Sequence, residues 1–230
     1  MNDDKSQVPS SLCWSLDEWD KKYEEGNYNW HEPDVNGWLR THKARYKEKG
    51  TILFPLCGKT VDMKYLIDEG YKVVGVEYSK LAVEEFFAEN DIEFSKTKNV
   101  DFDSYKSEDG RITIHNGDFF RANRELVGRI DGVWDRAALV AVNPEDRRRY
   151  ADTITGLMDE TTVYLVSSVS YDQSQLRGGR GFSVPAQMIR GLYGSTCDIE
   201  LLCDVTNEMF KRVYDVDWFL ESLYCLRLKC

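Results

Sequence analysis

The stretch TILFPLCGKT (residues 51–60) decides the fold, because an apolar run breaks at a proline and then turns through a single glycine. After Thr60, apolar residues resume at roughly helical spacing, so this order predicts a strand, a tight loop and a helix. In an open α/β sheet, ligands bind in the crevice beyond the carboxyl ends of the strands. The loop around Gly58 is therefore the first candidate ligand site.

The same alternation of strand and helix patterns continues along the chain. The later apolar runs that predict strands span residues 71–76, 112–115, 130–134, 163–169, 199–205 and 222–228, with the last two at one edge. The polar residues 95–110 predict a loop. Strands that alternate with helices imply right-handed crossovers and a mostly parallel sheet, so the fold class is α/β.

Length and composition narrow the class of protein. A chain of 230 residues fits one domain, and its net charge of −10 would repel a phosphate backbone, so nucleic acid is not an expected partner. No apolar stretch reaches the roughly 18 residues of a membrane span, and the start lacks the apolar core of a signal peptide. Six scattered cysteines and three histidines without zinc-ligand spacing predict reduced thiols and no metal. We expect a monomeric, cytoplasmic protein.

The N-terminal part has two regions. Residues 1–12 are polar and lack periodicity, which predicts a mobile tail, while residues 13–230 are expected to form a single domain. Ser15 and Glu18 have the spacing of a capping box, so a helix should begin there, with Trp19 and Tyr23 on one face. Two interpretations stay open: the helix packs its aromatic residues on the core, or it forms a lid over a ligand.

Three nucleotide-like ligands use a strand, loop and helix of this kind. A phosphate-binding P-loop needs GxxxxGK[ST], but Leu53 stands where its first glycine is required. A dinucleotide-binding loop needs GxGxxG, and this loop has one glycine, so both ATP and NAD are disfavoured. S-adenosylmethionine remains, because its amino-acid tail needs only backbone contacts and a tight turn.

Carboxylates at two expected strand ends support this choice. Glu77 follows Gly58 at close to the roughly 20 positions at which a carboxylate binds ribose hydroxyls in such folds. Asp118 ends the third expected strand, where its carboxylate would meet the adenine amine while Phe119 packs on the ring. The alternatives are a plain surface acid for Glu77, and a turn-forming Asp118 beside a core Phe119.

Several longer motifs carry a resemblance. They are FPLCGK (residues 54–59), VVGVE (73–77), VWDRAALVAVNP (133–144) and SYD (170–172). In this order they resemble the thiopurine S-methyltransferase family, and the resemblance runs from about Leu16 to Leu226. It implies a class I methyltransferase fold, with three Rossmann-like layers around a seven-stranded, mostly parallel sheet that has an antiparallel edge strand. It also implies methyl transfer from S-adenosylmethionine to the sulfur of a small aromatic or heterocyclic thiol.

The resemblance also implies roles for individual residues. The N-terminal helix covers the cofactor, Trp19 and Trp30 are the covering aromatics, and Trp30 also faces the acceptor. The residues implied to line the cofactor are Leu56, Gly58, Glu77, Asp118, Phe119 and Arg136. Arg136 also reaches the acceptor and is the implied catalytic residue, because its charge favours the thiolate nucleophile. The other interpretation of Arg136 is an ion pair with Asp135 or another helix-start acid.

Two departures from the family pattern concern the acceptor pocket. Phe210 stands where mammalian members have a second arginine thought to face the substrate, with Lys211 and Arg212 adjacent. Arg180-Gly181 replaces a proline pair in their substrate loop, and Arg180 is a further candidate for acceptor binding. Three function classes stay open: the thiol methyltransferase, a methyltransferase for a hydroxyl, halide, thiocyanate or metalloid species, and a noncatalytic S-adenosylmethionine-binding module.

Overall fold

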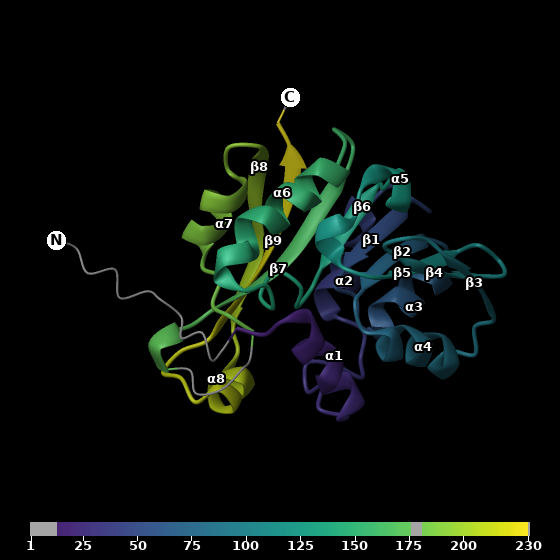
Figure 1. The fold of residues 1–230 in the computed structure, drawn as a ribbon. Coiled ribbons are helices and arrows are strands. Elements are labelled where there is room, and N and C mark those ends of the chain that lie inside the picture. Colours follow the sequence, from purple (N-terminus) through teal and green to yellow (C-terminus); the bar gives the residue numbers. More distant parts are fainter. Residues whose placement is uncertain (1–12, 176–180, 230) are drawn as a thin grey trace.

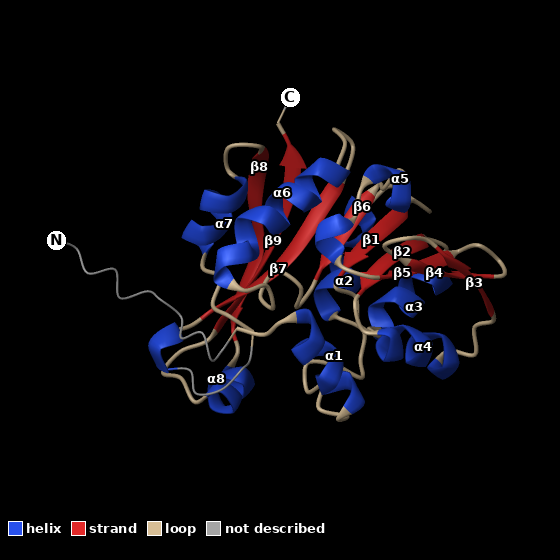
Figure 2. Ribbon diagram, viewed as in Figure 1, coloured by secondary structure: helices blue, strands red, loops and turns tan. Residues whose placement is uncertain are grey.

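The computed structural model describes residues 13–175 and 181–229, so the expected tail at residues 1–12 lies outside it. In the described part of the chain, nine strands form one sheet in the order β3-β4-β5-β2-β1-β6-β7-β9-β8 (Figure 1). Helices cover both faces of this sheet, as the colouring by secondary structure makes clear (Figure 2). The expected three-layer α/β fold is therefore confirmed.

The strands agree closely with the expected alternation, and the central ones are parallel. Their bounds are β1 Thr51–Pro55, β2 Lys72–Glu77, β3 Phe94–Lys98, β4 Asp103–Ser107, β5 Ile112–Asn116, β6 Gly132–Asp135, β7 Val163–Ser170, β8 Cys197–Thr206 and β9 Leu220–Leu228. β5, β2, β1, β6 and β7 run parallel in that order. The chain moves outward from β1 in both directions, so a topological switch point lies between β1 and β6, where ligands bind in such sheets.

Side chains cap the starts of several helices. Their bounds are α1 Leu16–Glu24, α2 Gly37–His42, α3 Val61–Asp68, α4 Lys80–Glu89, α5 Arg124–Val127, α6 Arg147–Leu157, α7 Ala186–Tyr193 and α8 Glu208–Tyr214, with short 3-10 turns η2 Lys43–Arg45, η3 Phe119–Arg121, η4 Pro144–Asp146 and η5 Gln173–Gln175. The predicted capping box of Ser15 and Glu18 is present at α1. Thr60 and Ser79 accept backbone N–H groups at the starts of α3 and α4 in the same way.

Two apolar clusters fill the space between the layers. Alternate residues of each strand point to opposite faces, so Leu53 belongs to one cluster while Ile52 and Phe54 belong to the other. The first cluster packs beneath α5, α6 and α7, and the second beneath α2, α3 and α4. α1 lies across the carboxyl edge of the central strands rather than on either face (Figure 1). This position makes α1 the element that closes the ligand crevice.

The strand count differs from the expected seven. The polar residues 95–110 were expected to form a loop, but they contribute an antiparallel hairpin, β3 and β4, that extends the sheet beyond β5. All five residues of β3 are exposed, so the strand has no apolar pattern and is held by backbone pairing. Tyr105 of β4 is fully buried and contacts Phe87 and Phe94, which anchors the hairpin on α4.

The antiparallel strand at this end of the sheet is β9, which is the second strand from the edge and not the edge strand that was expected. β9 runs antiparallel to β7 and β8 runs antiparallel to β9, so the edge strand β8 has the direction of the parallel strands. The two expected final strands at this edge, 199–205 and 222–228, correspond to β8 and β9. The remaining seven strands, without the β3–β4 hairpin, have the number that the resemblance implies.

Candidate active site

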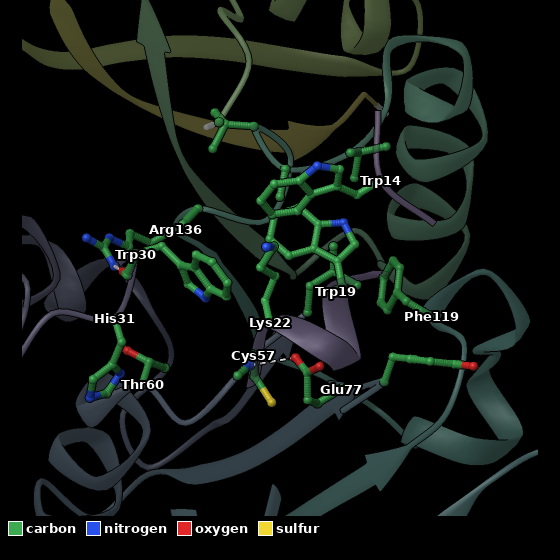
Figure 3. Close-up of a pocket in the computed structure, with 18 of the residues that line it drawn as sticks. Trp14, Trp19, Lys22, Trp30, His31, Cys57, Thr60, Glu77, Phe119 and Arg136 are labelled. Carbon is green, nitrogen blue, oxygen red and sulfur yellow. Dashed lines mark hydrogen bonds between the residues drawn. The ribbon is translucent and has the colours of Figure 1, made fainter. Parts of the chain in front are cut away.

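A cavity of about 880 Å³ opens at the carboxyl edge of the parallel strands. Its floor consists of residues that directly follow these strands, and its cover consists of α1 and the segment that follows it. The predicted residues that line it are Trp19, Trp30, Leu56, Gly58, Glu77, Asp118, Phe119 and Arg136. Figure 3 shows Glu77 beneath the indoles of Trp19 and Trp30, with Arg136 and Phe119 on opposite sides. The tertiary structure therefore brings every described site candidate to one cavity.

The turn at Gly58 is shaped by the backbone and by the helix above it. Leu56 and Gly58 have positive φ values of +45° and +51°, which reverse the chain between β1 and α3. A Cβ atom on Gly58 would lie 2.5 Å from the Tyr23 hydroxyl of α1. Glycine is therefore required here both by the backbone conformation and by the close approach of the cover.

Glu77 links this turn to the second strand. Its carboxylate is buried, with Oε2 accepting from the Gly58 N–H at 2.7 Å and Oε1 accepting from the Ser79 N–H at 2.8 Å. Burial raises the pKa of Glu77, while the backbone N–H groups act against that rise. An ionised carboxylate has about four lone-pair sites, so two remain for ribose hydroxyls. Glu77 is thus not a plain surface acid.

Lys59 is held by partners that keep it from the role of a P-loop lysine. Its ammonium lies 2.7 Å from Glu85 and 2.6 Å from Glu89 of α4, and it also contacts the ring of Tyr28. A P-loop lysine must reach the phosphates of the nucleotide. The glycine-lysine-threonine sequence in this chain is therefore a structural turn, which agrees with the argument against ATP.

Four aromatic rings form the cover. The ring centroids of Trp14 and Trp19 are 4.6 Å apart, and those of Trp19 and Trp30 are 5.2 Å apart, both in edge-to-face contact. The Trp30 indole N–H also donates to the Tyr23 hydroxyl at 3.3 Å. Figure 3 shows the three indoles side by side at the top of the cavity. Both interpretations of α1 apply, because Tyr23 is buried while Trp19 faces the cavity.

Asp118 and Phe119 have the structural roles that the sequence left open, a turn-forming acid and a core ring, and they also lie at the cavity. Asp118 caps η3, where its Oδ1 accepts from the Phe120 N–H at 2.9 Å, and Phe119 is buried against Tyr150. Both residues nevertheless line the cavity. A capping role for one carboxylate oxygen leaves the other oxygen available for a ligand amine.

Arg136 lies at the end of β6, and its neighbour Asp135 is not its partner. The buried Asp135 carboxylate accepts from the Leu139 N–H and from the hydroxyls of Tyr150 and Tyr164, at 2.7–3.0 Å. Arg136 instead donates to the Trp30 carbonyl at 3.1 Å, and its Nη2 lies 3.3 Å from Glu32 Oε1. The ion pair with Asp135 that the sequence left open is therefore absent, and Arg136 faces the cavity.

Asn143 stands directly before the 3-10 turn η4, but its side chain does not cap that turn. The amide of Asn143 instead bonds both backbone groups of Trp14: Oδ1 accepts from the Trp14 N–H at 3.2 Å, and Nδ2 donates to the Trp14 carbonyl at 3.1 Å. The start of the cover is thus held against the loop that follows β6.

Phe210 of α8, which stands where mammalian family members have a second arginine, lines the cavity. Val213 and Tyr214 line the cavity with it, at the spacing of one helical face. Lys211 lies outside this lining and pairs with Glu208 at 3.7 Å, and Arg212 is exposed. Neither cation replaces the missing arginine in this structure. Arg180 lies outside the described residues.

Three residues of the site were not predicted from the sequence. Glu32, Trp14 and Asn143 reach the cavity or its cover from segments that are distant in the chain. Glu32 stands two positions after Trp30, to which the resemblance had already assigned a role, and that was the available signal. No group of three or more potential metal ligands occurs among residues 13–175 and 181–229. Within the same ranges, no helix is long and apolar enough to cross a membrane.

The fold and site together define an α/β protein of the class I methyltransferase type. A solved S-adenosylmethionine-dependent methyltransferase from Anabaena variabilis has the same fold, with a TM-score of 0.64 at 12% identity, covering 93% of this chain and 95% of that chain. The fold also matches a Burkholderia thailandensis 1,6-didemethyltoxoflavin-N1-methyltransferase, solved with S-adenosylhomocysteine, with a TM-score of 0.60 at 15% identity over 91% and 86% of the two chains.

The family follows from sequence similarity. The model of the thiopurine S-methyltransferase family matches residues 14–229. A probable thiopurine S-methyltransferase from Danio rerio is 36% identical, covering 93% of this chain and 95% of the relative, and the enzyme from Rattus norvegicus is 34% identical over 97% and 96%. The chain belongs to the thiopurine S-methyltransferase family, which makes it an S-adenosylmethionine-dependent methyltransferase.

Proposed function

We propose that this chain transfers the methyl group of S-adenosylmethionine to the sulfur of a small aromatic or heterocyclic thiol. The observation that carries the proposal is the meeting of the Gly58 turn, Glu77 and Arg136 around one cavity in a chain of this family. The first two suit a nucleoside with an amino-acid tail, and Arg136 suits an anionic acceptor. A module that only binds the cofactor has no need of a cavity-facing arginine beside it.

The residues that would hold the cofactor fit it chemically. Glu77 retains acceptor capacity for ribose hydroxyls beyond the two backbone N–H groups that it already binds. Leu56 and Gly58 bring the backbone of this turn to the cavity, and Asp118 with Phe119 offers an acceptor and an apolar surface for a base. Trp19 and Trp30 would cover the cofactor and exclude water.

In the proposed reaction the cofactor provides the methyl group, and the protein stabilises and positions the acceptor. When bound, S-adenosylmethionine would supply an electrophilic methyl group: the bond between its sulfur and the methyl carbon would break, with the electron pair staying on that sulfur, while the acceptor thiolate bonds to the carbon. Arg136 stabilises that thiolate by its charge, after the thiol proton has gone to water. The walls of the cavity align the reacting sulfur with the methyl group, and such positioning accounts for most of the rate of an in-line transfer.

We further propose that the chain, as a single domain from residue 13, acts as a cytoplasmic monomer on small molecules and not on nucleic acid. All of the proposed site residues come from one chain, and the net charge of −10 opposes binding to a phosphate backbone. Light scattering during size-exclusion chromatography tests the monomer. A stable dimer at micromolar concentration would contradict it.

The deciding experiment measures transfer of a labelled methyl group from S-adenosylmethionine to a panel of aromatic thiols, alcohols and small anions. We expect the thiols to be methylated, and Arg136→Met to lower kcat by about 10- to 100-fold, the value of one hydrogen bond to a charged group. Arg212→Met removes an equal charge from an exposed position outside the cavity and should leave kcat unchanged. Methylation of alcohols or anions in preference to thiols would reject the proposed acceptor.

A further inference from the structure

Arg136 does not present an uncompensated positive charge to the cavity. Its Nη2 lies 3.3 Å from Glu32 Oε1, and its Nη1 donates to the Trp30 carbonyl at 3.1 Å. Both Arg136 and Glu32 line the cavity, and their side chains are 21% and 41% exposed. The charge of the proposed catalytic arginine is therefore balanced by a carboxylate that faces the same space.

The other cations that line the cavity are also engaged. Among the described lining residues, these are Lys22, Lys59 and Arg149. Lys22 lies 3.4 Å from Glu25, Lys59 is held by two glutamates, and Arg149 stacks on the ring of Phe120 at 4.3 Å. Each of them is therefore held by a group other than Glu32.

His31, Phe210 and Glu221 also line the cavity, and none of them carries a fixed positive charge. Burial, and after it the nearby Lys59, lower the pKa of His31, so the charged form of this imidazole is disfavoured. Phe210 contributes an aromatic ring, and Glu221 contributes a carboxylate that accepts from Asn207 at 3.0 Å. A carboxylated acceptor brought to Arg136 would therefore lie beside Glu32 without a second cation to hold it.

We propose that Glu32 is a specificity-determining residue that sets the acceptor's charge preference, by neutralising Arg136 and so favouring thiols that carry no carboxylate. The inference rests on the proposed function, because it concerns the acceptor of that reaction. A cation that is already paired with a carboxylate attracts a second carboxylate less strongly than an unpaired cation does, whereas the thiolate is common to all acceptors and does not distinguish them. The pair is partly exposed, and such pairs contribute little to folding, so the fold does not depend on Glu32.

Thiophenol and para-mercaptobenzoate test the inference, because they differ only in a carboxylate. The parent protein should prefer thiophenol. Glu32→Gln should raise the ratio of kcat/KM for para-mercaptobenzoate over thiophenol by about tenfold. In the Arg136→Met background the same substitution should leave this ratio unchanged, since the arginine that Glu32 neutralises is gone. Dissociation constants of both thiols, measured calorimetrically with S-adenosylhomocysteine present, should shift in the same way.

Asp34→Asn is the matched control. It removes the same charge two positions away, from an exposed residue that does not line the cavity, so the ratio should stay that of the parent. An unchanged ratio in Glu32→Gln, or an equal rise in the absence of Arg136, would overturn the role of Glu32. If neither thiol is methylated but the binding ratio shifts as expected, the proposed reaction fails while the charge preference stands.

Discussion

At the scale of single residues, consecutive residues after β6 and at its end have different roles: some stabilise the fold, and the next one faces the cavity. In the motif at the end of β6, Trp134 donates to Asp62, and Asp135 binds two tyrosine hydroxyls, so both are structural. Arg136, one position further on, faces the cavity. A buried, fully bonded carboxylate fixes the backbone from which the reactive side chain extends. Glu77 differs, because one carboxylate serves both the fold and the ligand.

Glu77→Ala should therefore weaken both cofactor binding and stability. The substitution removes the acceptor of the Gly58 and Ser79 N–H groups, which costs about 1–3 kcal/mol for each buried group left unpaired. It also removes hydrogen bonds to the cofactor, so the dissociation constant should rise by about 10- to 100-fold. Calorimetric titration and thermal unfolding measure the two effects.

The control is Glu108→Ala, which removes an acid from an exposed turn and should change neither quantity. A fall in melting temperature with unchanged affinity would assign Glu77 to the fold alone.

At the scale of elements, the cover of the cavity is held to the loop after β6 by polar contacts at both of its ends. The start of α1 is bound through the amide of Asn143, and the segment after α1 is bound through Arg136. The loop after β6 thus contacts both ends of the cover. Elements with few buried contacts open more readily than the sheet itself, so these polar contacts set how tightly the cover closes.

Asn143→Leu should loosen the cover while the sheet stays intact. Two hydrogen bonds to Trp14 are lost, each worth about 0.5–1.5 kcal/mol, so cofactor affinity should fall by roughly tenfold. Limited proteolysis should cleave faster before α2. Asn123→Leu removes a helix-capping amide at α5 that does not contact the cover, so it should lower stability without affecting affinity. Unchanged affinity in Asn143→Leu would show that closure does not depend on this contact.

The β3–β4 hairpin should make stability depend on pH through His115. This imidazole is buried, bonds the Ser104 hydroxyl at 2.8 Å, and burial lowers its pKa to about 4. Between pH 6.5 and pH 4 the unfolded chain binds more protons than the folded one, so stability falls as pH drops. The loss is about 3 kcal/mol.

The measurement is the free energy of unfolding from urea titrations across this pH range. His115→Gln should flatten the profile by about that amount, whereas His42→Gln, at a less buried imidazole, should flatten it much less. Parallel profiles for the parent and His115→Gln would show that this histidine does not contribute.

At the scale of the whole molecule, the fold places every described site candidate at one edge. Parallel strands carry their carboxyl ends to the same side of the sheet, so the turns after β1, β2, β5 and β6 meet although long stretches of sequence separate them. The extra hairpin lies beyond β5, at the far edge of the sheet, and does not alter this arrangement.

Ligand stabilisation of the whole protein should separate cofactor classes. S-adenosylhomocysteine at about 100 times its dissociation constant should add about 2.7 kcal/mol, which raises the melting temperature by roughly 5–10 °C for a chain of this size. ATP should produce no shift, because Lys59 is held by Glu85 and Glu89 and the turn has one glycine. Stabilisation by ATP without stabilisation by S-adenosylhomocysteine would reject the cofactor assignment.

The sequence by itself determined the parts of the site that depend on local geometry. The turn at Gly58, the carboxylate at the end of β2, the capping box of α1 and most of the strands follow from patterns within a few residues of each other. Periodicity, caps and the need for glycine at positive φ act through the nearest neighbours, so they can be read along the chain. The β3–β4 hairpin was not predicted, because β3 is exposed along its whole length and β4 is mostly polar in sequence, so neither strand has an apolar period.

Only the tertiary structure decided which distant residues meet. The pairing of Arg136 with Glu32, and not with its neighbour Asp135, depends on the cover folding back over β6. Asn143 lies 129 positions from Trp14, and its amide binds that backbone in place of the helix end beside it. For each of these polar side chains, the sequence contains several chemically equivalent groups that could be its hydrogen-bond or ion-pair partner. Packing selects one of them, because burial makes any unsatisfied alternative costly.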